Sequence, residues 1–258
     1  NRLYIQQGAA PAIPVTGNDK HRHADFIHDQ ARRRLIGIRE DHTQSDAQPI
    51  NTVCAVALDG SGSETVLVEG ADFYAAPRLS PDGKQLAWLS WNHPHMPWTV
   101  TECWLADVME DGSLGAPRKI AGGASESICQ PEWSPDGRLY FVSDRSGWWN
   151  IYRMDGENSV PLHPMPAEFG CPHWVFGKRM YGFISAEEIG CTYIENGVSH
   201  LARIDVANGN LQKIDTGYTD IQELCTGPGF MVLIAGSPTT PLEVVRIDLA
   251  SGKTEVMA

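Results

Sequence analysis

The residues best suited to covalent catalysis in this sequence are serines, and one of them has glycine spacing close to that of a hydrolase nucleophile. A nucleophile elbow reads G-x-S-x-G, because its serine sits on a strained turn with no room for flanking side chains. In Gly123-Ala124-Ser125-Glu126-Ser127 a serine stands in place of the second glycine. No histidine and aspartate are arranged with it as a Ser-Asp-His triad requires. We expect no catalytic residue and no peptide hydrolysis from this chain alone.

Two H-x-H pairs, His21-Arg22-His23 and His93-Pro94-His95, raise the question of a metal. Zinc needs three or four converging ligands, each held in place by further hydrogen bonds. Neither pair has a cysteine or a carboxylate cluster beside it in the sequence. We expect loop histidines near a rim, with no metal site and no cofactor.

Tryptophans are the other side chains that invite a binding interpretation. Trp133 and Trp174 occur at matching places in an internal repeat, which predicts that both are largely buried between adjacent sheets. Trp148 and Trp98 fall in loops between expected strands, where packing over the core and contact with a substrate both stay open. The six cysteines lie far apart beside apolar runs with no C-x-x-C pair, so we expect reduced thiols in apolar positions.

The charge of the chain restricts its partners. Its 258 residues include 20 lysines and arginines against 32 aspartates and glutamates, a formal net charge of −12. Nucleic acid and anionic membranes both demand a cationic face, so neither is expected as a partner. No uncharged apolar stretch approaches the roughly 20 residues that a membrane span needs. A cationic ligand, such as the amino terminus of a peptide, is compatible with this charge.

These side chains must be positioned by a repeated β unit. Ser80-Pro81-Asp82-Gly83 and Ser134-Pro135-Asp136-Gly137 each precede an apolar run, and a degenerate third copy at 172–177 leads into the run 180–185. The spacing of roughly 40 to 50 residues is typical of propeller blades. Proline and glycine supply the backbone angles of the turn between the first two strands of a blade.

A second turn recurs between the expected third and fourth strands of each unit, at Asp59-Gly60, Asp111-Gly112, Asp155-Gly156, Asn208-Gly209 and Ser251-Gly252. The sequence therefore predicts an all-β fold, a propeller with five four-stranded blades at about 18–70, 71–122, 123–164, 165–217 and 218–258. Residues 1–17 supply two strands of a further, incomplete blade. A solenoid or a sandwich is the less favoured fold.

We expect a single propeller domain over 1–258 that is a fragment of a larger protein, because a ring with part of a blade is physically odd and the sequence starts with Asn1. No secretory leader is visible, and a cytoplasmic location is expected.

Four stretches, at 73–98, 126–137, 142–152 and 167–177, resemble the propeller of bacterial acylaminoacyl-peptidase-like proteins, which belong to the prolyl oligopeptidase family of serine peptidases. The resemblance covers nearly the whole chain, and the composite around 126–152 is its most specific part. It implies a partner on the same polypeptide, a C-terminal α/β-hydrolase domain with a Ser-Asp-His triad, and a peptide substrate. The sequence departs from the family at Thr99, where an aspartate is more usual.

The resemblance also implies which loops face the substrate. Loops between the second and third strands, together with those between blades, would lie on the face that meets the hydrolase domain. Acidic side chains there would receive the amino terminus of the substrate. We expect Glu126 and Glu168 to do so, each directly before the innermost strand of a blade, with Asp72, Tyr74 and Trp148 as weaker companions.

The resulting function is a substrate-gating and recognition domain of a peptidase of the aminopeptidase or acylaminoacyl-peptidase type. The alternative is a stand-alone TolB-like propeller that serves as a protein-interaction module. A metal-dependent lactonase-type propeller is a remote third, because the carboxylate-rich channel that it requires is not found in the sequence.

Overall fold

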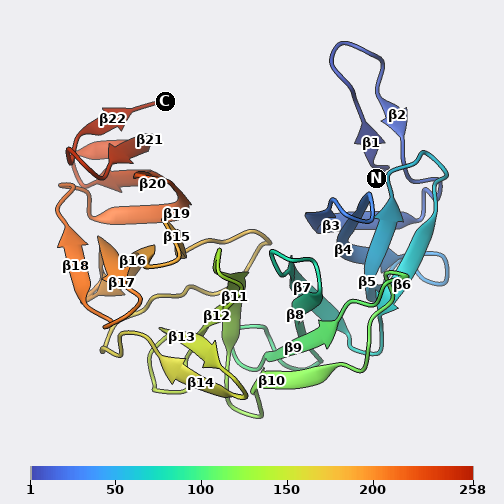
Figure 1. Ribbon diagram of the computed structural model, residues 1–258, viewed down its shortest axis with the longest axis horizontal. Coiled ribbons are helices and arrows are strands. Elements are labelled where there is room, and N and C mark those ends of the chain that lie inside the picture. Colours follow the sequence, from blue (N-terminus) through green and yellow to red (C-terminus); the bar gives the residue numbers. More distant parts are fainter. Residues whose placement is uncertain (1, 258) are drawn as a thin grey trace. The chain divides into compact units, whose positions relative to one another are not determined.

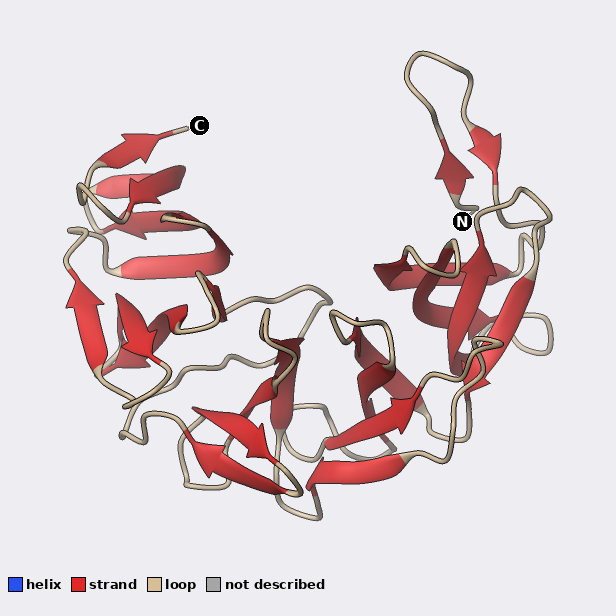
Figure 2. Ribbon diagram, viewed as in Figure 1, coloured by secondary structure: helices blue, strands red, loops and turns tan. Residues whose placement is uncertain are grey.

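The structure is a computed structural model that describes residues 2–257, and every regular element within that range is a β-strand (Figure 2). The chain divides into two compact units, the first ending at Ala124 and the second beginning at Ser125. Each unit is described by itself. The strands form five four-stranded antiparallel sheets and one two-stranded sheet, in which neighbours in sequence are neighbours in space (Figure 1).

The first unit contains the two-stranded sheet and two of the four-stranded sheets. The two-stranded sheet pairs β1 (Tyr4–Ile5) with β2 (Ile13–Pro14). The next sheet consists of β3 (His21–Asp29), β4 (Arg34–Asp41), β5 (Ile50–Ala57) and β6 (Glu64–Val68). The third consists of β7 (Phe73–Leu79), β8 (Gln85–Trp91), β9 (Glu102–Asp107) and β10 (Arg118–Gly122).

The second unit contains the remaining three four-stranded sheets. They are β11 (Ile128–Trp133), β12 (Leu139–Ser143), β13 (Asn150–Asp155) and β14 (Asn158–Pro161); β15 (Tyr181–Phe183), β16 (Glu188–Glu195), β17 (Val198–Asp205) and β18 (Leu211–Ile214); and β19 (Asp220–Gly227), β20 (Phe230–Ser237), β21 (Thr240–Asp248) and β22 (Thr254–Val256). The five four-stranded units predicted from the sequence are confirmed.

The predicted turns form through their own side chains. At the β7–β8 turn the Ser80 hydroxyl donates to Asp82 at 2.6 Å and accepts from the backbone N–H of Gln85 at 2.9 Å. Gly83 then adopts φ +70°, a conformation that other residues rarely take. Ser134 and Asp136 repeat this arrangement at the β11–β12 turn. The five predicted turns between third and fourth strands also lie where expected, each with its glycine at positive φ.

The first strands of four sheets share a bulge at a residue with positive φ: Asp25, Ala76, Gln130 and Glu223. Two of these side chains, Asp25 and Gln130, bind the neighbouring sheet of the same unit. The Asp25 carboxylate accepts the N–H of Ala76 at 2.6 Å. Gln130 accepts the N–H of Met180 at 2.7 Å and donates to the Tyr181 carbonyl at 2.6 Å. The bulges therefore join successive sheets by polar contacts as well as by packing.

The apolar core lies between sheets within each unit. In the first unit Ile36, Val53, Leu86 and Trp88 pack together, and each is 4% exposed or less. In the second, Leu201, Leu224, Met231, Leu233 and Val245 do the same.

The tryptophan prediction is wrong for Trp174, which is 71% exposed, and Trp133 is only half-buried. Residues 172–177 belong to no strand, and the run 180–185 begins the first strand of its sheet, β15, instead of the second. The third copy of the repeat is therefore not a strand–turn–strand unit, which leaves Trp174 in a connecting segment without a sheet above it.

All six cysteines are free thiols, as expected, and four of them are buried: Cys54, Cys103, Cys129 and Cys191. Burial raises the pKa of the Cys54 thiol to about 12. Cys225 is exposed, in contrast to the apolar position that the sequence predicts. The described residues contain no helix that could cross a membrane.

Candidate functional site

One end of the β11–β14 sheet gathers three of the predicted site residues. We call it the loop end: residues 123–127 enter β11 there, and residues 144–149 connect β12 to β13. The two segments are joined where the Asp144 carboxylate accepts the N–H of Ser127 at 2.7 Å. The Ser-Pro-Asp-Gly turn lies at the opposite end of β11 and β12. Glu126, Glu168 and Trp148 all approach this loop end.

Glu126 is held by an arginine of the connecting loop. Its Oε1 lies 2.7 Å from Arg145 Nη2 and accepts a hydrogen bond from the Ser143 hydroxyl at 2.5 Å. The Arg145 guanidinium also stacks over the Tyr152 ring, 4.9 Å from its centroid, and donates to Ser159. The Glu126 side chain is 17% exposed. Its negative charge is thus compensated by a neighbour that is itself fixed in place.

Glu168 reaches the same end by a different route from the one the sequence suggests. The first strand of its sheet, β15, begins only at Tyr181, so Glu168 does not directly precede an innermost strand. Its backbone instead pairs with Ile194 of β16, with hydrogen bonds of 3.0 and 2.9 Å. The half-buried side chain then turns to the loop end, where Oε2 accepts the N–H of Trp149 at 2.9 Å.

The segment after Glu168 is packed tightly, which fixes the carboxylate. Phe169 is 1% exposed, donates its N–H to the Trp149 carbonyl at 2.6 Å and stacks on Tyr193. A Cβ on Gly170 would lie 2.7 Å from the Trp149 ring, so only glycine allows this approach. No cation is paired with the Glu168 carboxylate among residues 2–257. Glu168 therefore carries an uncompensated, positioned charge.

Trp148 projects from the loop that both glutamates contact. Trp148 is 43% exposed, whereas the neighbouring Trp149 is only 9% exposed. The Trp148 carbonyl accepts hydrogen bonds from Ser146 Oγ at 3.0 Å and from Asn150 Nδ2 at 3.2 Å. The loop backbone is thereby fixed, and an exposed indole projects from the loop that the Glu168 carboxylate contacts at Trp149.

Asp72 and Tyr74 belong to the other unit, at the β7–β8 sheet. Asp72 Oδ2 accepts the N–H of His93 at 2.8 Å, so it braces the loop that follows β8. Tyr74 is 3% exposed, and its hydroxyl accepts the N–H of Ala71 at 2.8 Å. Burial raises the pKa of this phenol. Both residues make structural contacts in their own sheet.

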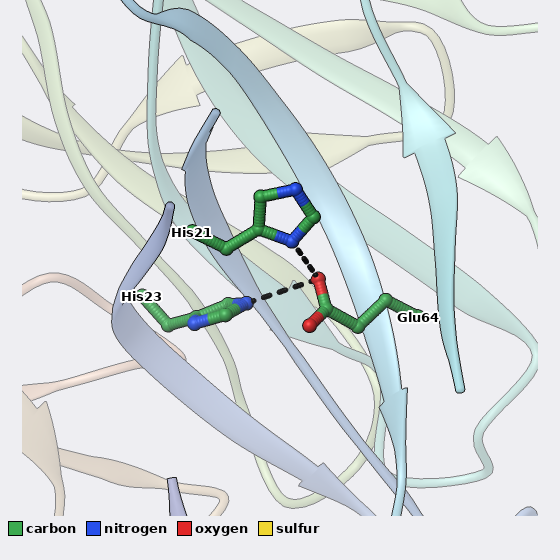
Figure 3. Close-up of side chains that lie close together, drawn as sticks. All are labelled: His21, His23 and Glu64. Carbon is green, nitrogen blue, oxygen red and sulfur yellow. Dashed lines mark hydrogen bonds and ion pairs between the residues drawn. The ribbon is translucent and has the colours of Figure 1, made fainter. Parts of the chain in front are cut away.

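A second polar cluster lies in the first unit, and there the expectation of loop histidines is wrong for the first H-x-H pair, whereas His93 and His95 do lie in the loop after β8. His21 and His23 are on strand β3, not in a loop, and Glu64 of β6 reaches both (Figure 3). Glu64 Oε2 lies 2.7 Å from His21 Nδ1 and 3.3 Å from His23 Nε2. The carboxylate comes from a residue 43 positions after His21, which no local pattern shows.

Further charged groups surround this cluster. Arg39 Nη1 is 3.6 Å from Glu64 Oε2, and its Nη2 is 4.0 Å from Asp41 Oδ2. His21 Nε2 lies 3.5 Å from Asp41 Oδ2 and 3.0 Å from Asn18 Nδ2. Burial lowers the pKa of His23, and the nearby Glu64 charge opposes that shift only in part. The cluster is a set of imidazole and carboxylate groups that point toward one another.

Comparisons with known proteins place this geometry in context. No protein-family model and no curated protein matches the chain. Among solved structures, puromycin hydrolase is 33% identical with a TM-score of 0.91, and a puromycin-hydrolyzing peptidase of Mycobacterium tuberculosis is 33% identical with a TM-score of 0.89. Each match covers 99% of this chain and 41% of the other. The fold is also that of prolyl oligopeptidase B from Galerina marginata, with 11% identity, a TM-score of 0.73 and coverage of 93% and 34% of the two chains.

Proposed function

We propose that this chain, which belongs to the β-propeller domains of the prolyl oligopeptidase family, gates and recognises peptide substrates for a serine peptidase. The catalytic partner in this proposal is an α/β-hydrolase domain on the same polypeptide. The chain itself holds no nucleophile elbow, so its contribution is selection and positioning of the substrate.

The observation that carries the proposal is the match to the puromycin-hydrolysing enzymes. At 33% identity over 99% of the chain, the similarity extends through loops as well as strands. The chain spans about two fifths of those enzymes, so the chemistry of hydrolysis belongs to the remainder. In this proposal the propeller selects substrates because they must pass or contact it before they reach the catalytic serine.

The loop end of the β11–β14 sheet supplies the chemistry for recognition. Puromycin, like a peptide with a free amino terminus, presents an α-ammonium group next to the amide that is cleaved. A fixed carboxylate that receives this ammonium sets how far the substrate enters, and therefore which bond reaches the nucleophile. Glu168 suits this role because its charge is uncompensated and its position is fixed by Trp149 and β16.

Glu126 is proposed to act in the same site mainly through Arg145. Its oxygen is shared between the guanidinium and the Ser143 hydroxyl, which lowers its own attraction for a second cation. It also keeps the positive charge of Arg145 neutralised close to the place where an ammonium would bind. The exposed Trp148 indole adds a surface on which an aromatic substrate side chain or the cation itself can stack.

Two experiments test the proposal. The gene downstream of this segment should encode roughly 250 further residues with a G-x-S-x-G elbow before a helix. The full-length protein should hydrolyse aminoacyl chromogenic amides, and this chain alone should not. A gene with a secretory leader and no hydrolase domain would instead support the TolB-like interaction module. Cytoplasmic location is part of the peptidase proposal and is tested by cell fractionation of the full-length protein.

A further inference from the structure

We propose that His21, His23 and Glu64 form a binding site for one divalent transition-metal ion, with zinc as the expected ion. The site lies in the β3–β6 sheet of the first unit (Figure 3). It does not rest on the proposed peptidase role, and it gives the chain a property that substrate recognition does not require.

The distances between the ligand atoms are close to those of a tetrahedral site. One nitrogen from each histidine and one Glu64 oxygen lie within 4.8 Å of one another. Zinc bonds of about 2.0 to 2.1 Å at tetrahedral angles place neighbouring ligand atoms about 3.3 Å apart. His23 Nε2 is already 3.3 Å from Glu64 Oε2. His21 Nδ1, at 2.7 Å, needs to move away by about 0.6 Å, which a side-chain rotation supplies.

The outer ring nitrogen of His21 faces a carboxylate, which is a usual partner of metal-bound histidines, and an amide NH2 group that donates instead of accepting. His21 Nε2 faces the Asp41 carboxylate at 3.5 Å and the Asn18 amide at 3.0 Å. A carboxylate behind a ligating imidazole fixes the orientation of the ring and increases the basicity of the nitrogen that binds the metal. His21 is thus held with Nδ1 directed at the place where the ion would bind.

The charge of the cluster also favours a cation. Two carboxylates, Glu64 and Asp41, face one guanidinium, that of Arg39, which leaves one negative charge when both imidazoles are neutral.

The hydrogen bonds and ion pairs of the cluster leave part of it buried without full pairing. His23 Nδ1 and Arg39 Nε are both buried and find no hydrogen-bond partner among residues 2–257. The His23 side chain is fully buried and the Glu64 side chain is 7% exposed, so water reaches these groups poorly. Polar groups that are buried without full pairing destabilise a fold unless another interaction offsets them. A metal bound to His21 Nδ1, His23 Nε2 and Glu64 would offset the cost of burying these ligands, while His23 Nδ1 and Arg39 Nε keep no partner among residues 2–257.

The ligand set decides which ion is expected. Two imidazoles and one carboxylate suit zinc, cobalt, nickel or copper, whereas magnesium and calcium prefer sites made of oxygen atoms. Three protein ligands leave a fourth position for water. The ion would connect β3, the first strand of its sheet, to β6, the last, and so stabilise the folded unit.

The experiment measures metal binding by the full-length protein, with calorimetric titration of zinc and X-ray absorption at the zinc edge. The variants are His23→Asn and Glu64→Gln. The matched control is His28→Gln, since His28 is on the same strand but exposed. We expect one zinc ion per chain, an absorption spectrum with two imidazole nitrogens and carboxylate oxygen, and a rise in Tm of about 5 to 10 °C at a hundredfold excess over Kd.

In the two ligand variants we expect affinity to fall by about tenfold or more, with no change in the control. Absence of saturable zinc binding, or equal affinity in the parent and both ligand variants, would overturn the proposal. If a variant fails to fold by circular dichroism, the absorption spectrum of the unmodified protein decides, because a ligand shell without two imidazoles contradicts the site.

Discussion

Replacing Glu168 by glutamine in the full-length protein tests the proposed substrate site most directly. The substitution keeps the shape of the side chain and an oxygen that can accept from Trp149, so the packing around the loop end is preserved. What it removes is the negative charge. If Glu168 receives the substrate's α-ammonium group, binding of that group must weaken while binding of the rest of the substrate stays the same.

The size of the effect follows from the surroundings of the carboxylate. Opposite charges about 4 Å apart attract by about 1 kcal/mol in water and about 4 kcal/mol near a protein surface. Because Glu168 is half-buried, we expect an intermediate loss of about 2 kcal/mol. This corresponds to a decrease of about 30-fold in kcat/KM for a substrate with a free amino group. An amino-blocked substrate should lose about threefold or less.

Glu126→Gln should lower kcat/KM for substrates with a free amino group by another route, since it leaves the Arg145 charge uncompensated near the substrate's ammonium group. The double variant Glu126→Gln/Arg145→Gln should then recover much of the activity, whereas Arg145→Gln should not rescue Glu168→Gln. The assay compares aminoacyl p-nitroanilides with their N-acetylated forms. Glu157→Gln serves as control, because Glu157 is exposed in the β13–β14 turn at the opposite end of the same sheet. Equal losses on free and blocked substrates, or none, would refute this reasoning.

Three further predictions concern stability, each measured by urea unfolding. Gln130→Ala should cost about 2 to 4 kcal/mol, because the Met180 N–H and Tyr181 carbonyl lose buried partners; a loss below about 1 kcal/mol would contradict that role. Ala76 has φ +50°, so Ala76→Gly should keep the free energy of unfolding or raise it by up to about 1 kcal/mol. The control Ala75→Gly should lower the free energy of unfolding, and equal losses in the two variants would argue against strain at the bulge. Burial lowers the pKa of His173 to about 4, so the unfolded chain binds this proton more readily than the folded chain does. The free energy of unfolding should therefore fall as pH drops from about 6.5 to about 4, by at most about 3 kcal/mol because two backbone carbonyls face the ring. His173→Asn should flatten this pH dependence, and an unchanged pH profile in that variant would contradict the role of His173.

The sequence predicted the parts of the fold that are encoded locally. Each Ser-Pro-Asp-Gly turn forms through hydrogen bonds within six residues, so its sequence is sufficient to identify it. The glycine turns between third and fourth strands are equally local. The bulges could not be predicted, because Asp25, Ala76, Gln130 and Glu223 are not glycines and have no shared residue type. Asp25, Ala76 and Gln130 instead make hydrogen bonds to a neighbouring sheet, and the local sequence does not show such contacts.

The two clusters of charged side chains also differ in how much of each could be predicted from the sequence. Glu126 is 17 residues before Ser143 and 19 before Arg145, and their shared loop end could be predicted from the order of the strands. The ion pair that makes Glu126 different from Glu168 could not be predicted. The sequence around a glutamate is the same whether or not a guanidinium lies beside its carboxylate in the fold. His21 and His23 were visible as a pair, but Glu64 is brought to them only when four strands have assembled.

A propeller gives such sites a rigid base, and this determines where changes in specificity can arise. At the loop end, Phe169 and Gly170 lock the backbone behind Glu168, while Trp148 stands in an exposed loop. If Glu168 receives the substrate's ammonium group, substitutions behind the carboxylate would move it and misplace the substrate, because the segment has no room to adjust. Substitutions of Trp148 would alter the stacking that its indole offers to a side chain or ammonium group of the substrate, while the Glu168 carboxylate stays in place. Specificity for the first residue of a substrate is therefore expected to vary through position 148, with the distance to the cleaved bond set by Glu168.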